Sequence, residues 1–222
     1  MKILEIEIQT DNINETENFY TDILGFQLTS KSDGLITFKT GNSILRFIKS
    51  DNIKPRYHFA FNIPANKLEE AINWTKSKVK LIENEEKSVV ANFENWNANA
   101  IYFYDNNDNI LEFIVRHDLN NPTEKPFEIS VIESISEIGI VTDEPLELSG
   151  NLIETCELFY FEKSTKSDEF VALGNDNGLF IIVKKNRQWY PTSQNAEKHF
   201  SRVKIEIGNK IKDIVINEKI EY

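Results

Sequence analysis

Two carboxylates and one imidazole stand in segments where large apolar side chains alternate with polar ones: Glu5, His58 and Glu112. Successive side chains of a β-strand point to opposite faces, so each of the three points away from the apolar residues beside it. Carboxylates and imidazoles transfer protons and ligate metal ions. The three side chains could therefore face one polar lumen, if their strands belong to one curved sheet.

Each of the three residues also has a purely structural interpretation. Glu5, with Glu7 on the same face, is typical of a solvated acid on an open sheet. His58 could be a histidine whose hydrogen bonds are satisfied in the core, and Glu112 could form an ion pair with Arg46. The residue types and their spacing leave these interpretations open beside the chemical one.

The segments that carry these residues repeat along the chain. The same layout of two strands and a turn covers three segments: residues 35–50, 100–117 and 169–185. In the first and third segments, Arg46 and Ile181 stand at the position of Glu112. The residues around Glu137 likewise repeat those around Glu5. A repeat at this spacing determines the architecture of the whole chain.

Alternation and helical spacing predict three β-α-β-β-β units and a remnant of a fourth. The first strands of these units are expected at residues 3–9, 57–63, 136–143 and 201–207. The helices are expected at residues 13–24, 65–77 and 146–159. Arg202 takes the place of His58 in the remnant. Residues 118–130, which contain two prolines, are the expected linker. It separates a paired domain at 1–117 from a degenerate, incomplete second domain at 131–222.

Composition limits the classes of partner. A net charge of −11 argues against binding to nucleic acids and anionic membranes, which attract clustered Lys and Arg. The sequence has no apolar run long enough for a transmembrane helix and no signal peptide at its start. We therefore expect a cytoplasmic protein. Cys156 has no second cysteine to pair with and is expected as a small buried apolar residue.

Two phrases carry a resemblance to a known superfamily: NFYTDILGF at residues 18–26 and YFYDNNDNILEFI at residues 102–114. With the paired units, they resemble the vicinal oxygen chelate superfamily of glyoxalases, fosfomycin-resistance thiol transferases, bleomycin resistance proteins and extradiol dioxygenases. The resemblance is clear over residues 1–116 and weaker over 131–207. It implies an α+β fold in which tandem βαβββ units form curved, cup-like mixed sheets with the helices outside.

The resemblance also implies a site inside the cup, at the first and last strands of two paired units. In the first two units these positions are Glu5, Arg46, His58 and Glu112. Glu5, His58 and Glu112 are the implied metal ligands, a set that suits Fe, Mn, Ni or Zn. Glu112 is also the expected catalytic residue. Arg46 departs from the family's acidic fourth ligand and is expected to bind an anionic substrate.

The matching positions of the second half are Glu137, Ile181 and Arg202, which do not form a metal-binding set. We expect Glu137 and Arg202 to pair with each other, and the second half to pack against or extend the first cup. Two functions follow for the chain. It is either a divalent-metal-dependent enzyme, of the lyase, dioxygenase or thiol transferase class, or a metal-free protein that binds a small molecule and in which Arg46 pairs with Glu112. Paired units can also be exchanged between two chains, so a homodimer is possible.

Overall fold

The alternating segments form the strands of one large curved sheet in the computed structural model, which describes residues 1–51, 53–217 and 220–221. The first unit contains β1 (Lys2–Thr10), α1 (Ile13–Asn18), a π-helical turn (Phe19–Ile23), β2 (Gln27–Ser32), β3 (Leu35–Thr40) and β4 (Ser43–Lys49). The second unit contains β5 (His58–Ile63), α2 (Leu68–Lys76), β6 (Leu81–Ile82), β7 (Val90–Phe93), β8 (Ala98–Tyr104) and β9 (Ile110–Arg116).

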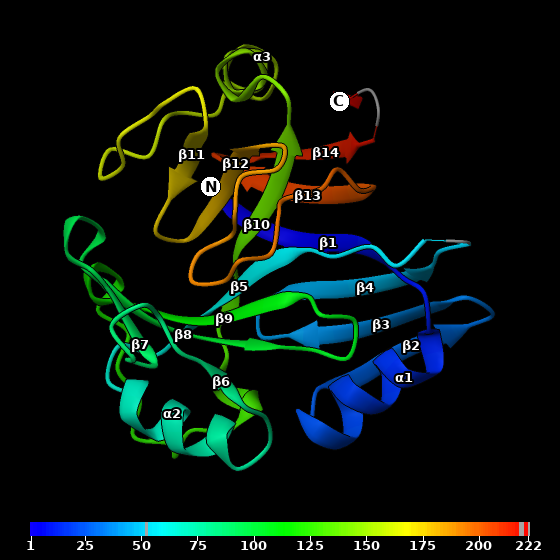
Figure 1. The fold of residues 1–222 in the computed structure, drawn as a ribbon, viewed down its shortest axis with the longest axis vertical. Helices are drawn as coiled ribbons and strands as arrows, with labels where there is room; N and C mark the ends of the chain where they lie inside the picture. Colours follow the sequence, from blue (N-terminus) through cyan, green and yellow to red (C-terminus); the bar gives the residue numbers. More distant parts are fainter. Residues whose placement is uncertain (52, 218–219, 222) are drawn as a thin grey trace.

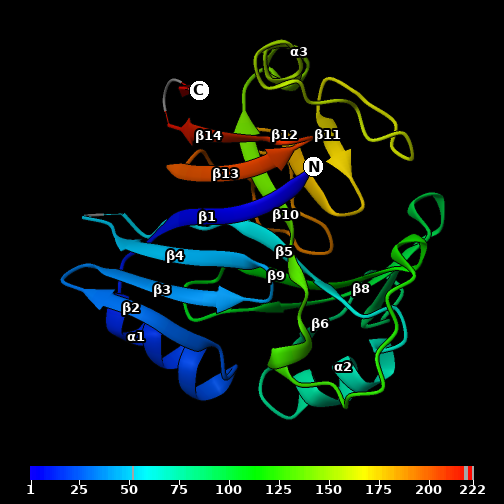
Figure 2. The same cartoon turned by 180° about the vertical axis from the view of Figure 1, so that it is seen from behind.

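The third unit contains β10 (Ser134–Thr142), α3 (Pro145–Cys156), β11 (Phe170–Asn175) and β12 (Gly178–Lys184). The remnant of the fourth contains β13 (Ser201–Ile207), β14 (Lys210–Ile216) and β15 (Ile220–Glu221). The helices lie on the outside of the sheet, α1 and α2 on one side and α3 at the opposite end (Figures 1 and 2). The α+β class and the repeated βαβββ plan are therefore confirmed. No helix in the described part of the chain is long and apolar enough to cross a membrane.

Local signals in the sequence set the first helical segment as expected. The side chain of Asn12 accepts a hydrogen bond from the backbone N–H of Glu15 and caps the N-terminus of α1. The segment widens into the π-helical turn and ends before Gly25, whose φ of +83° favours glycine.

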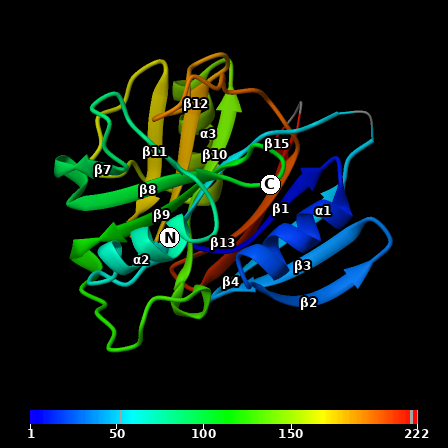
Figure 3. The same cartoon turned by 60° about the horizontal axis from the view of Figure 1, so that its bottom comes forward.

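The pairing of units in the structure corrects the expected one. β5 of the second unit pairs antiparallel with β10 of the third, while β1 of the first pairs antiparallel with β13 of the fourth. β1 and β10 meet only at Ile3 and Ile135. The first two units therefore do not close one cup together. Figure 3 shows how β10–β12 run across the direction of β8 and β9, which curves the sheet of the second and third units.

The segment 118–130 provides the physical reason for this pairing. It folds back over α2, where the buried ring of Phe127 packs against Trp74 and Phe113. The backbone N–H of Phe127 donates to the Glu70 carboxylate at 2.7 Å. This return brings the chain to the free edge of β5, and β10 adds there. The domain boundaries at 117 and 131 stay a prediction, and one apolar core crosses them.

Candidate metal centre

Three ionisable side chains converge on the concave face of the sheet formed by the second and third units. One ligand atom each from His58, Glu112 and Glu137 lies within 4.8 Å of the other two. Strand register explains the convergence. Ala60 of β5 pairs with Glu112 of β9 on one side and with Glu137 of β10 on the other. His58 precedes Ala60 by two residues and so lies on the same face. All three side chains are buried.

His58 is held as a neutral imidazole with one free nitrogen. Its Nδ1 lies 3.1 Å from the carbonyl oxygen of Ile110, which can only accept, so Nδ1 carries the hydrogen. Burial lowers the pKa of His58 to about 4, so the ring is uncharged at neutral pH. Its Nε2 then points a lone pair toward Oε2 of Glu112, 3.5 Å away. A neutral imidazole fixed by a carbonyl is a typical metal ligand.

The surroundings of Glu112 favour its protonated form. Burial first, and then the nearby charge of Glu137, raise the pKa of Glu112 well above its usual range. Arg116 and a hydrogen bond from the Tyr102 hydroxyl favour the ionised form, but they do not reverse the shift. While no cation is near, this environment favours the protonated form of Glu112 more strongly than water would.

Glu137 is paired with Arg116, whose side chain is completely buried. Nη2 of Arg116 donates to Oε1 of Glu137, and its Nε donates to Ser136 at 3.2 Å. Burial raises the pKa of Glu137 and the guanidinium opposes that rise. Among the described residues, no hydrogen bond engages Oε2 of Glu137, so this oxygen can face a ligand.

The donor set fits a divalent metal ion. It supplies one imidazole nitrogen and two carboxylates, a combination suited to Fe, Mn, Ni or Zn. A divalent charge would let both acids stay ionised in a buried place, where Arg116 alone offsets one of them. The fourth position of the repeat holds Ile181, whose apolar side chain also borders the site. Three protein ligands would leave coordination positions open to water or substrate.

A cavity of about 270 Å³ opens above the cluster and is bordered mainly by aromatic rings. The Trp189 ring, which is 5% exposed, lies 5.1 Å from the His58 ring. It fits because residue 139 is glycine: a Cβ there would stand 2.6 Å from the indole. Tyr190 is more exposed and packs edge-on against Tyr102. Arg187, Trp189 and Tyr190 therefore form one wall of the cavity.

The structure places the other predicted site residues elsewhere, which corrects the expected ligand set. Glu5 is not with His58 and Glu112. Nη1 of Arg46 lies 3.0 Å from Oε1 of Glu5 and 3.4 Å from Oε2 of Glu7. Both belong to the sheet of the first and fourth units. The alternation of side chains along the strand predicted which face of the sheet Glu5 lies on. It could not predict whether that face lines the cup of the first and fourth units or the cup of the second and third.

Two further pairings also differ from expectation. Glu137 pairs with Arg116 rather than with Arg202, and Arg202 binds both oxygens of Asp213, at 2.8 and 2.7 Å. The second half therefore contributes Glu137 to the candidate metal-binding cluster instead of only supporting it. Sequence reasoning missed Glu137 as a ligand, although its match to Glu5 in the repeat was a sufficient signal. No signal marked Arg116.

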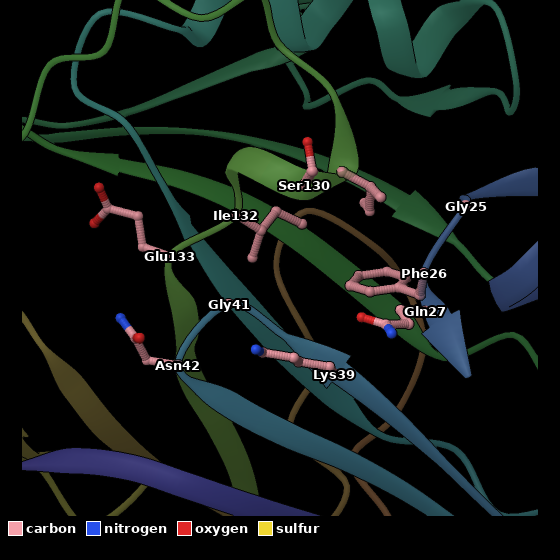
Figure 4. Close-up of a pocket in the computed structure, with 10 residues that line it drawn as sticks. Gly25, Phe26, Gln27, Lys39, Gly41, Asn42, Ser130, Ile132 and Glu133 are labelled. Carbon is pink, nitrogen blue, oxygen red and sulfur yellow. The ribbon is translucent and has the colours of Figure 1, made fainter. Parts of the chain in front are cut away.

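A larger groove of about 650 Å³ lies between the ends of β2 and β3 and residues 129–133 (Figure 4). The close-up shows Lys39, Gln27 and Glu133 spread around its rim. Gly41 lies against the Glu133 backbone, where a Cβ would stand 2.2 Å from the carbonyl oxygen. The groove is a junction between segments and gathers no ionisable cluster among the described residues, so the smaller cavity is the candidate site.

One solved structure is similar in fold to nearly the whole chain, and others are similar to about half of it. A structure of a proposed dioxygenase from Bacillus subtilis is similar over 99% of this chain and 86% of its own, with a TM-score of 0.60 and 14% identity. Lactoylglutathione lyase from Agrobacterium tumefaciens covers 50% of this chain and 90% of its own, at 20% identity and a TM-score of 0.41. The fosfomycin resistance protein FosX from Listeria monocytogenes, solved with Mn(II), covers 51% of this chain and 89% of its own, at 18% identity and a TM-score of 0.39.

No curated protein sequence matches the chain. The family model of the Glyoxalase/Bleomycin resistance protein/Dioxygenase superfamily matches residues 2–118, which is more than half of the sequence. The chain therefore belongs to the Glyoxalase/Bleomycin resistance protein/Dioxygenase superfamily.

Proposed function

We propose that this protein is a divalent-metal-dependent enzyme that acts on a small substrate bound through two neighbouring oxygen atoms. The observation that carries the proposal is the convergence of His58, Glu112 and Glu137 at the base of a cavity lined by aromatic rings. The reaction belongs to one of the classes found in the superfamily: lyase, dioxygenase or thiol transferase. Fe, Mn, Ni and Zn all suit the donor set. The expected cytoplasmic location stays a prediction.

The chain's own residues have distinct roles in this proposal. A bound divalent ion supplies Lewis-acid stabilisation of negative charge on substrate oxygens. His58 and Glu137 hold their positions because Ile110 and Arg116 fix them from behind. Glu112 is the catalytic residue in this proposal: the ion would keep its carboxylate ionised, and a carboxylate in this position could take a proton from the substrate. Trp189 and Tyr190 form an aromatic wall beside the substrate.

A metal-free binding protein is the second candidate, and one observation favours it. Arg116 already pairs with Glu137, and the Tyr102 hydroxyl already bonds Glu112, so each acid of the cluster has a protein partner without a metal ion. In that case the cavity would bind its ligand through aromatic packing alone.

The relaxation rate of water protons near bound Mn(II) tests the enzyme proposal. Three protein ligands leave room for exchanging water, so binding of Mn(II) to the protein should enhance the rate. Acetohydroxamate, which binds metals through two adjacent oxygens, should then reduce the enhancement by displacing that water. Failure to bind Mn(II), Fe(II), Ni(II) or Zn(II) would leave the metal-free candidate. Mn(II) bound without exchangeable water would contradict an open catalytic position.

A further inference from the structure

One cationic side chain borders the cavity and has no role in holding the cluster. Arg187 lies on the segment between β12 and β13 and lines the cavity together with Phe170. Among the described residues, no carboxylate lies within ion-pairing distance of its guanidinium. The other lining groups that carry charge are the two acids of the cluster. Arg187 is therefore the free positive charge of this cavity.

The backbone around Arg187 is fixed while its guanidinium keeps unused donors. The N–H of Arg187 donates to Lys184 at 3.1 Å, and its carbonyl accepts from Ala196 at 2.8 Å. The guanidinium lies 5.3 Å from the centre of the Phe170 ring, and Nη1 donates to the Gln188 carbonyl at 3.2 Å. An arginine with a fixed backbone and free donors is well suited to bind a carboxylate.

Charge balance makes an anionic ligand favourable here. The whole chain carries a net charge of −11, which repels anions from most of its surface. Inside the cavity, a divalent ion would offset the charges of Glu112 and Glu137. Arg116 and Arg187 would then leave the site positive. A neutral ligand would not use this charge.

The remaining walls select the body of the ligand. The rings of Phe93 and Trp96 lie 5.8 Å apart, and Tyr190 meets Phe93 edge-on at 6.0 Å. Such rings favour a flat, unsaturated partner, because offset and edge-on contacts add to simple apolar burial. The volume of about 270 Å³ is just below the usual range for drug-sized ligands, so it accommodates about one substituted ring.

We infer that the substrate is a small aromatic acid whose ring packs among Phe93, Trp96 and Tyr190 and whose carboxylate binds Arg187. This inference rests on the proposed function and names the substrate class of the same site. Arg187 acts as a specificity residue, because it contacts the substrate away from the reacting oxygens. Acids should bind better than neutral compounds of the same shape.

3,4-Dihydroxybenzoate and 3,4-dihydroxybenzamide test this, since both offer two adjacent oxygens to the metal and differ mainly in the charge of the substituent on the other side of the ring. Their dissociation constants would be measured by calorimetry on the Mn(II)-loaded full chain. Removing a hydrogen bond to a charged group costs about 1.5–3 kcal/mol, so Arg187→Gln should weaken dihydroxybenzoate binding about 10- to 150-fold. Dihydroxybenzamide binding should change less than about twofold, and Arg187→Lys should restore part of the dihydroxybenzoate affinity.

Arg202→Gln is the matched control, because it removes the same charge from the sheet of the first and fourth units. It should leave dihydroxybenzoate binding unchanged. The inference is overturned if Arg187→Gln binds dihydroxybenzoate like the wild type, if it weakens both probes equally, or if the wild type does not bind dihydroxybenzoate at millimolar concentration. Repeating the titrations in EDTA separates the two proposals. If EDTA changes the affinity of the wild type for neither probe, the metal-dependent function is refuted. The ratio of the acid's affinity to the amide's affinity in Arg187→Gln reports on Arg187 alone.

Discussion

Metal binding should release about one proton per chain at neutral pH. The number follows from the protonation of the three ligands before the ion arrives. Burial and Glu137 raise the pKa of Glu112, which favours its protonated form, while His58 is already neutral because burial lowers its pKa to about 4. Glu137 faces the Arg116 guanidinium and contributes little. Displacing the Glu112 proton links metal affinity to pH.

The magnitude can be worked out from that single proton. Affinity for Mn(II) should rise about tenfold for each pH unit while Glu112 is protonated in the free protein. Between pH 5.5 and 7.5 this amounts to about 100-fold, or about 2.7 kcal/mol. Below pH 4 the slope should steepen, because His58 then gains a proton as well.

Calorimetry in two buffers of different ionisation enthalpy measures the released protons directly. Glu112→Gln is the matched variant, since its amide has no proton to lose at this position. It should bind Mn(II) more weakly and release almost no proton. Affinity that does not change between pH 5.5 and 7.5, with no proton release by the wild type, would refute the protonation of Glu112 in the metal-free protein.

Three further predictions concern stability, measured by urea denaturation. Arg116→Met leaves Glu137 buried without its partner and should lower the free energy of unfolding by about 3–5 kcal/mol. The double variant with Glu137→Gln should recover most of that loss, and additive losses would contradict this. Gly139→Ala places a Cβ 2.6 Å from the Trp189 indole and should lower the free energy of unfolding by about 1–3 kcal/mol. Gly150→Ala in α3 is the control, because nothing lies within 4 Å of the added Cβ, and it should stabilise the protein by up to about 1 kcal/mol. Equal effects of the two substitutions would contradict the close packing at Gly139. Burial raises the pKa of Asp105 from 3.8 to about 6, so the folded state binds more protons than the unfolded one and stability from this group falls as pH rises from about 4 to 6. Relative to Asp105→Asn, the wild type should therefore lose up to about 3 kcal/mol across that window, and a constant difference would show that the shift is absent.

Local patterns in the sequence predicted most of the fold. Alternation located β1, β5 and β9, and the repeat gave the βαβββ plan, because both depend on neighbouring residues. The pairing of units could not be predicted in this way. Whether β5 takes β10 or β1 as its neighbour depends on how residues 118–130 fold back over α2, and that contact joins segments far apart in sequence.

The same limit explains the candidate site. The alternation of side chains along each strand correctly placed His58 and Glu112 on a concave face of the sheet. It placed Glu5 on such a face as well, but in the other cup, where Arg46 neutralises it. Glu137 stood at the corresponding position of the third unit and completes the cluster. The residue types were therefore readable from the sequence, and their grouping required the strand register.

The number of Mn(II) ions bound per chain, compared between Glu137→Gln and Glu5→Gln, tests the central claim most directly. Both variants remove one carboxylate from a first strand, so they differ only in the cup that they alter. The grouping of His58, Glu112 and Glu137 predicts one bound ion in the wild type and in Glu5→Gln, and a loss of that binding in Glu137→Gln. Binding that survives Glu137→Gln but is lost in Glu5→Gln would contradict it.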